Sequence, residues 1–207
     1  MAIVLRVFHR EGAGRPIRVL WTLEELGEPY ELTTMTRDEA GGAVHRARHP
    51  LGRVPVLQLD DGYVFESAAI CLHLADSHLE AGLIGPLGSR ARALTYQWSI
   101  FAPAELEPSI IQALRLAEAN PELAEKARAR FFEAANAVAE GLGEASYLVD
   151  GRFGVADVLV GSALAFTRRA KFPEALPDPL EDYLTRLFER PAFERARERS
   201  SAAPASA

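Results

Sequence analysis

One pair of short segments limits the fold of this chain more than any other feature. Residues 52–57 read Gly-Arg-Val-Pro-Val-Leu, and residues 66–70, which read Glu-Ser-Ala-Ala-Ile, begin nine residues after Leu57. A proline directly before a short apolar strand indicates a fixed turn, and we expect a cis bond between Val54 and Pro55. Such a turn leaves the Val54 backbone facing outward at a sheet edge. The second segment opens a helix, whose free N–H groups attract a carboxylate. Together they predict a docking site for a short, extended, acidic peptide.

Length and composition exclude several classes of protein. The 207 residues are enough for one large domain or two small ones, each with a buried core. A formal net charge of -6 argues against general nucleic-acid binding. The single cysteine, Cys71, excludes an internal disulfide and favours a reducing compartment. Because we see neither a signal peptide nor the roughly 20 consecutive apolar residues of a membrane span, we expect a cytoplasmic protein without membrane or nucleic-acid partners.

The hydrophobic patterns of residues 1–80 predict a thioredoxin-like domain. The expected order is strand, helix, strand, helix, strand, strand, helix, which is typical of an α+β layer with a mixed four-stranded sheet. A proline at position 16 starts the first helix, and Gly27 with Pro29 ends it. The expected strands are residues 3–8, 30–34, 54–59 and 63–65, and the expected helices are residues 16–26 and 67–78. Residues 38–48 are expected to form a weak, polar helix or an irregular segment.

The remainder of the chain is predicted to be an all-α helical bundle. Glycines and a proline make residues 81–89 a linker, and residues 90–199 form the helical domain. Residues 200–207 are small or polar, which predicts a disordered tail. The expected helices are residues 91–119, 122–142, 156–170, 180–189 and 192–198. The helix at 156–170 is nearly apolar on all sides and is expected at the centre of the bundle.

Several segments together resemble the glutathione S-transferase family, in its bacterial, cytosolic type. Residues 18–21, 23–27 and 29–31 resemble the family's first helix and second strand. Residues 50–55 and 66–70 resemble its glutathione-binding motifs. Residues 153–157 resemble the capping motif of the central helix in the second domain, although Gly154 replaces the family's serine or threonine. The resemblance implies a homodimer with a substrate pocket between the domains, glutathione as co-substrate and no metal.

The resemblance and simple electrostatics give each residue of the glutathione site a role. Val54, held by Pro55, pairs with the cysteinyl backbone of glutathione as a one-residue strand extension. The helix N-terminus and the Ser67 hydroxyl bind the γ-glutamyl carboxylate. Glu66 faces the α-amino group, and Arg53 is the nearest cation for the glycyl carboxylate. Taken singly, Glu66 and Ser67 have a simpler explanation as helix caps, and Pro55 as a turn residue.

The group that normally serves the glutathione sulfur is missing. The family places a tyrosine, serine or cysteine near the end of the first strand, and by alignment that position falls at Ala13 or Gly14. We expect backbone amides at Gly14, with the charge of Arg15 or His9, to stabilise the thiolate instead. The simpler explanations are that Arg15 is a solvated cation at a helix start and that His9 faces solvent at a strand end.

The sequence therefore predicts a glutathione transferase that conjugates the glutathione thiolate to small apolar electrophiles. Tyr96 and Phe101 are candidates for the apolar pocket, whereas Cys71 is expected to be a small buried residue. The histidines lack metal-ligand spacing, so no metal is expected. Two alternatives remain open: a non-catalytic module that binds glutathione or another ligand, and a module that keeps the fold only to dimerise.

Overall fold

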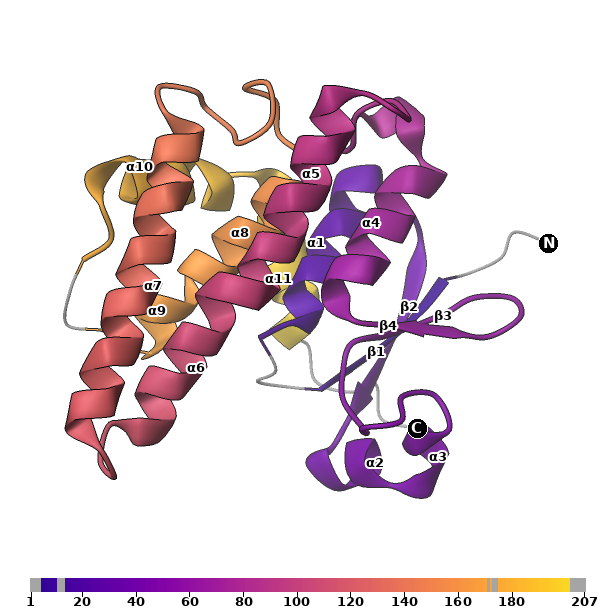
Figure 1. Cartoon of the computed structure of the whole chain (residues 1–207). Coiled ribbons are helices and arrows are strands. Elements are labelled where there is room, and N and C mark those ends of the chain that lie inside the picture. The colour runs from indigo at the N-terminus through magenta and orange to yellow at the C-terminus, as the bar shows by residue number, and fades with distance from the viewer. Residues whose placement is uncertain (1–4, 11–13, 171, 173–174, 202–207) are drawn as a thin grey trace. The chain divides into compact units, whose positions relative to one another are not determined.

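The computed structural model divides the chain into two compact units (Figure 1). It describes residues 5–10, 14–170, 172 and 175–201. The first unit contains Met1–Ala81 together with Glu189–Ala207, and the second contains Gly82–Phe188. The C-terminal segment, which the sequence pattern assigned to the helical domain, therefore groups with the N-terminal unit.

The first unit is built on a mixed four-stranded sheet, as predicted. The strands lie in the order β2-β1-β3-β4, with β1 and β2 parallel and the other two pairs antiparallel. Two crossovers and one tight hairpin produce this order, which matches the predicted thioredoxin-like layer. The strands are β1 (Leu5–Arg10), β2 (Tyr30–Met35), β3 (Val56–Gln58) and β4 (Tyr63–Phe65).

Local sequence signals account for the ends of the first helix. Pro16 occupies its first turn, where a missing N–H group costs little. Gly27 ends the helix in the left-handed region at φ 69°, which glycine adopts without a steric penalty. Leu20, Trp21 and Leu23 from this helix are fully buried. The helices of the first unit are α1 (Pro16–Leu26), α2 (Arg37–Gly41), α3 (Ala43–Arg46), α4 (Ser67–Ser77), the 3-10 turn Leu79–Ala81 and α11 (Pro191–Ser201).

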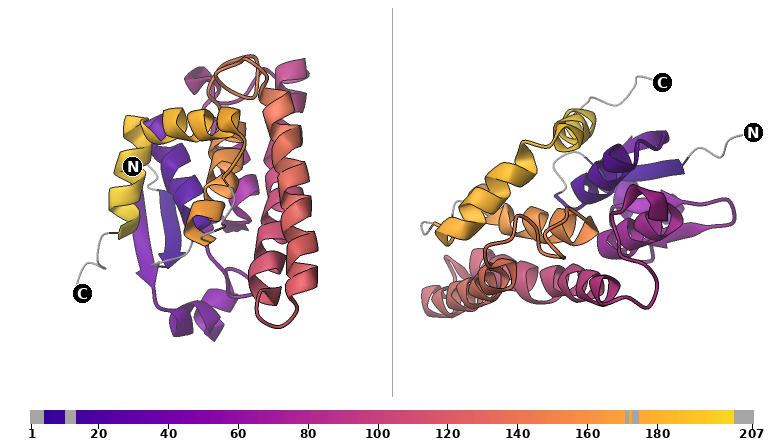
Figure 2. Two further views of the ribbon diagram at one scale, coloured as in Figure 1. Left: turned by 90° about the vertical axis from the view of Figure 1, so that its left-hand side faces the viewer. Right: turned by 90° about the horizontal axis from the view of Figure 1, so that it is seen from above.

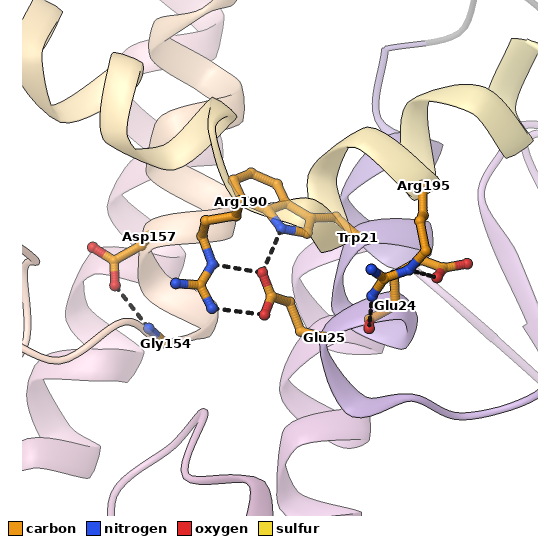
Figure 3. Close-up of polar contacts among 7 residues, drawn as sticks. All are labelled: Trp21, Glu24, Glu25, Gly154, Asp157, Arg190 and Arg195. Atoms are coloured by element: carbon orange, nitrogen blue, oxygen red, sulfur yellow. Dashed lines mark hydrogen bonds and ion pairs between the residues drawn. The ribbon is translucent and has the colours of Figure 1, made fainter.

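The C-terminal helix α11 packs against α1 (Figures 1 and 2). The Phe193 ring meets Trp21 edge-on at 4.9 Å between centroids, and Arg190 forms two hydrogen bonds to the Glu25 carboxylate (Figure 3). Helix α11 extends to Ser201, so Ser200 and Ser201 are helical rather than part of the expected tail. Residues 202–207 of that tail lie outside the described residues.

The regular secondary structure among the described residues of the second unit is helical, apart from an isolated bridge between Val149 and Arg152. The long helix expected at residues 91–119 contains a π-helical turn, because Pro103 and Pro108 each lack the N–H group that the α-helical ladder requires. The helices are α5 (Arg90–Phe101), the π turn Ala102–Leu106, α6 (Glu107–Leu116), α7 (Pro121–Leu142), α8 (Val155–Leu164), α9 (Phe166–Ala170) and α10 (Asp178–Phe188). No described helix is both long and apolar enough to cross a membrane.

Helix α8 lies at the centre of the second unit and is held by an unusual cap. The Asp157 carboxylate accepts a hydrogen bond from the Gly154 N–H at 2.8 Å (Figure 3). It also accepts from the Leu148 N–H at 3.0 Å and the Tyr183 hydroxyl at 2.7 Å. Gly154 has no side chain to complete a reciprocal capping box, and a Cβ atom there would lie 2.7 Å from the Leu83 carbonyl oxygen. The glycine is thus required by close approach of the backbone.

We expect Gly154→Ser to destabilise the protein, although serine is the better helix cap. The new Cβ would displace the Leu83 carbonyl, which accepts the Val155 N–H at 2.9 Å, and overpacking of this kind costs about 1–3 kcal/mol. Urea unfolding measures the change. Gly62→Ser is the matched control, because a Cβ on Gly62 meets nothing within 4 Å. A Gly154→Ser protein more stable than wild type would show that capping outweighs the clash.

Candidate functional site

The two segments that define the candidate glutathione site leave the sheet side by side. The β3–β4 ladder pairs Val56 with Phe65, and the chain continues from this pair into residues 53–55 on one side and 66–68 on the other. The expected cis bond between Val54 and Pro55 is present. Within the part of the chain that the structure describes, neither the N–H nor the C=O of Val54 forms a hydrogen bond. Both groups are therefore open to an extended peptide.

The turn before Val54 is anchored to the helices beneath it. The Nε2 atom of buried His45 lies 2.7 Å from the carbonyl oxygen of Arg53, so this nitrogen carries the proton and donates it. Gly52 adopts φ 61°, and a Cβ atom there would lie 2.6 Å from the Ala40 carbonyl oxygen. The Arg53 side chain is exposed and forms no hydrogen bond or ion pair with any described residue. Its charge is thus presented to solvent by a fixed backbone.

A buried histidine beside this turn responds to the local charges. His49 accepts the Leu51 N–H at its Nδ1 atom, 3.1 Å away. Burial lowers the pKa of His49, the Glu66 carboxylate opposes that effect, and the nearby His45 and Arg53 reinforce it. His49 is therefore a neutral, structural side chain at pH 7.

Glu66 and Ser67 open helix α4, but neither caps it in the usual way. Glu66 has φ 71° and ψ 114°, a strained backbone for a residue with a Cβ, and its side chain accepts no capping hydrogen bond. Its carboxylate is exposed, which leaves it available to a ligand. Ser67 is buried, and its Oγ atom lies 3.3 Å from Nη1 of Arg18. The simple capping explanation therefore does not describe Glu66.

Arg18 is a site residue that sequence reasoning missed. It lies on α1, only 4% exposed, and reaches the first residue of α4. The available signal was an arginine among the apolar residues of α1, where a buried charge requires a partner. Ser67, the residue it contacts, is also 4% exposed.

Cys71 lies buried on α4, as the sequence indicated. Burial raises the pKa of its thiol to about 12, although a hydrogen bond with Thr22 and the charge of Arg18 act in the opposite direction. The thiol is therefore protonated at neutral pH and is not a nucleophile.

The segment expected to serve the sulfur is described only in part. Ala13 lies outside the described residues, Gly14 is exposed, and Arg15 is the half-buried residue that precedes α1. The Arg18 N–H is bonded to the Arg15 carbonyl at 3.2 Å. Since Pro16 has no N–H group, the free amide within the first turn of α1 is that of Ile17.

His9 does not face solvent, contrary to the simpler expectation. It is 1% exposed on β1, and its Nε2 atom lies 3.1 Å from the Ser200 carbonyl oxygen on α11. Because a carbonyl only accepts, His9 donates this proton to the C-terminal helix. The same nitrogen cannot then serve a thiolate, so His9 is left out of the proposed chemistry below.

The two expected pocket residues of the helical unit are not brought together. Phe101 lines a groove of about 600 Å³ between the start of α6 and α7, together with small and polar residues. The Tyr96 hydroxyl lies instead 3.3 Å from Nη1 of Arg92, outside that lining. Among the described residues, no group of three or more histidine, cysteine and acidic side chains is placed to hold a metal ion.

Comparison with known proteins finds similarity to glutathione S-transferases. Residues 3–76 match the family described as "Glutathione S-transferase, N-terminal domain". Glutathione S-transferase GstA of Escherichia coli O157:H7 is 27% identical over 196 residues, which are 93% of this chain and 96% of GstA.

Two solved structures share the fold and much of the length. A glutathione transferase of Methylococcus capsulatus str. Bath has a TM-score of 0.83 and 26% identity, and the match covers 95% of this chain and 98% of that one. BphK, a bacterial glutathione S-transferase solved as a ternary complex, has a TM-score of 0.85 and 26% identity, with 95% and 100% covered. Residues 3–76 thus match the N-terminal domain of the glutathione S-transferase family, and nearly the whole chain is similar to bacterial glutathione S-transferases.

Proposed function

We propose that this protein joins the glutathione thiolate to small apolar electrophiles. One observation carries the proposal: the open backbone of Val54 and the open N-terminus of α4 emerge together from the β3–β4 ladder. An extended peptide that ends in a carboxylate satisfies both. Similarity to glutathione S-transferases supports glutathione as that peptide.

The proposed contacts follow from charge and exposure. The cysteinyl backbone of glutathione pairs with Val54, whose position Pro55 and the His45–Arg53 hydrogen bond fix. The γ-glutamyl carboxylate binds at the N-terminus of α4 and at Ser67, and the glutamyl amino group faces the exposed Glu66. The exposed Arg53 binds the glycyl carboxylate.

Backbone amides, together with Arg15, are proposed to activate the sulfur. A thiol of pKa about 8.5 is only about 3% thiolate at pH 7, and a pKa lower by about two units gives roughly 25 times more. The exposed Gly14 permits close approach of the backbone, and the Ile17 amide lies in the same turn. The thiol proton leaves to solvent. The thiolate then forms a sulfur–carbon bond, and the leaving group departs with its electron pair.

Phe101 remains the candidate for contact with the electrophile, because it lines an open groove, whereas Tyr96 is engaged by Arg92. We also propose a homodimer, as the family resemblance implies.

A titration of the glutathione thiolate tests the proposal directly. Ultraviolet absorbance of bound glutathione at saturating protein should give a midpoint well below the pKa of about 8.5 of a free thiol, and an activated aromatic chloride should be turned over. Arg15→Ala should raise the midpoint and slow conjugation. An unshifted midpoint together with absent turnover would overturn the catalytic proposal.

The absence of a tyrosine, serine or cysteine from residues 9–17 favours one second candidate. The protein would then bind glutathione without activating it. Calorimetric binding of glutathione with an unshifted thiolate midpoint is the result that this candidate predicts.

A further inference from the structure

We infer that Arg18 is a positioning residue that turns the Ser67 hydroxyl proton toward the glutamyl carboxylate of bound glutathione. The inference deepens the proposed function and rests on it. Two helices carry the pair: Arg18 on α1 and Ser67 at the start of α4, which pack against each other (Figures 1 and 2).

The two side chains differ in the hydrogen bonds that they can donate and accept. A guanidinium is a donor only, so across the 3.3 Å between Nη1 and Oγ the proton belongs to Arg18 and Ser67 accepts. The hydroxyl of Ser67 keeps its own proton and one further lone pair. Because it cannot give that proton to Arg18, it must direct it elsewhere, and the free N-terminus of α4 is where the carboxylate is proposed to bind.

Electrostatics point in the same direction. Arg18 is a cation that is 96% removed from solvent, next to the positive end of the α4 dipole. An anion that binds at the α4 N-terminus is attracted by both of these positive features. The charge of Arg18 is also felt deeper along α4, where it favours the thiolate form of Cys71. The site should thus bind a carboxylate more tightly than a neutral amide.

A purely structural role for Arg18 makes a different prediction. If Arg18 only bridged α1 and α4, its loss would lower stability and weaken every ligand equally. If Arg18 is a positioning residue, the affinity that is lost in an Arg18 variant depends on the ligand carboxylate and on the Ser67 hydroxyl. The two roles are therefore separated by the choice of ligand and by a double-mutant cycle.

The experiment uses calorimetric binding to the full chain, with thermal unfolding of each variant recorded alongside. The ligands are glutathione and an analogue in which the glutamyl α-carboxylate is a primary amide. Arg18→Met should weaken glutathione binding about 10- to 100-fold, but the amide analogue less than about threefold. In a Ser67→Ala background, Arg18→Met should weaken glutathione binding much less than it does in the wild type. Arg18→Lys remains a donor-only cation and should recover part of the loss.

Arg190→Met is the matched control, because Arg190 is a partly buried arginine of the same unit that bonds to Glu25 rather than to Ser67. It should lower the unfolding temperature and leave the glutathione dissociation constant within about threefold. If Arg18→Met does not fold, Arg18→Lys and Ser67→Ala still test the dependence on the carboxylate.

The outcomes distinguish the two levels of the proposal. Wild-type protein that does not bind glutathione overturns the proposed function, and the inference with it. Wild-type protein that binds glutathione, with Arg18 variants that bind as tightly or that lose both ligands equally, overturns the inference alone.

Discussion

Asp157→Ala is expected to lower the free energy of unfolding by about 3–5 kcal/mol, one of the two largest effects we predict. The carboxylate is fully buried and accepts three hydrogen bonds, from Gly154, Leu148 and Tyr183. Alanine would leave two backbone N–H groups and one hydroxyl buried without acceptors, and would remove the last side-chain contribution to the α8 cap. Urea unfolding monitored by circular dichroism measures the loss. A change below about 1 kcal/mol would show that other groups cap α8.

Asp157→Asn provides the control for charge. The amide keeps one acceptor oxygen, so we expect a smaller loss than with alanine. Burial raises the pKa of Asp157 to about 6, while its three hydrogen bonds act to lower it. This folded-state pKa lies above the unfolded value of about 3.9. The stability that protonated Asp157 contributes is therefore fully present below about pH 4 and is lost as pH rises through about 6. The stability advantage of wild type over Asp157→Asn should therefore shrink by about 1 kcal/mol between pH 5 and pH 7.

Local signals in the sequence predicted the first unit well. Pro16 and Gly27 marked the ends of α1, and the Asp60–Gly62 turn separated β3 from β4. These features depend on backbone dihedral preferences of single residues, which the sequence states directly. The expected cis bond before Pro55 is of the same kind.

The features that the sequence did not predict depend on contacts between distant segments. The helix at residues 192–198 was expected, but its packing against α1 required knowing that Phe193 meets Trp21 and that Arg190 meets Glu25. For the same reason, His9 was expected to face solvent, because its strand alone does not show that α11 covers it.

The residues of the candidate site fall into the same two groups, those visible in local motifs and those that depend on distant contacts. The residues that a ligand would touch, Arg53 to Pro55 with Glu66 and Ser67, lie in two short motifs and were visible in the sequence. Arg18 was not, because its role depends on a contact across 49 residues of chain. The left-handed backbone of Glu66 was also hidden, since glutamate has no preference for that conformation.

Glu25→Ala is the second large prediction, with an expected loss of about 2–4 kcal/mol. The Glu25 carboxylate is 10% exposed and accepts from Arg190 Nε at 2.6 Å, Arg190 Nη2 at 2.7 Å and Trp21 Nε1 at 2.9 Å (Figure 3). Alanine would leave a partly buried guanidinium and a buried indole N–H without this acceptor. Urea unfolding reports the loss, and amide hydrogen exchange should increase along α11.

Arg195→Ala is the matched comparison on the same helix. Arg195 also bonds to a glutamate of α1, Glu24, at 2.8 Å, but its side chain is 52% exposed, so we expect a loss of no more than about 1 kcal/mol. Equal losses of unfolding free energy for Glu25→Ala and Arg195→Ala would show that burial does not decide the strength of the ion pairs between α11 and α1. Arg18 and Ser67 contact each other without Glu25. We therefore expect Glu25→Ala to weaken the packing of α11 on α1 and to leave the affinity for glutathione unchanged. We therefore predict that Glu25 serves the stability of the first unit and that Arg18, on the same helix, serves ligand recognition.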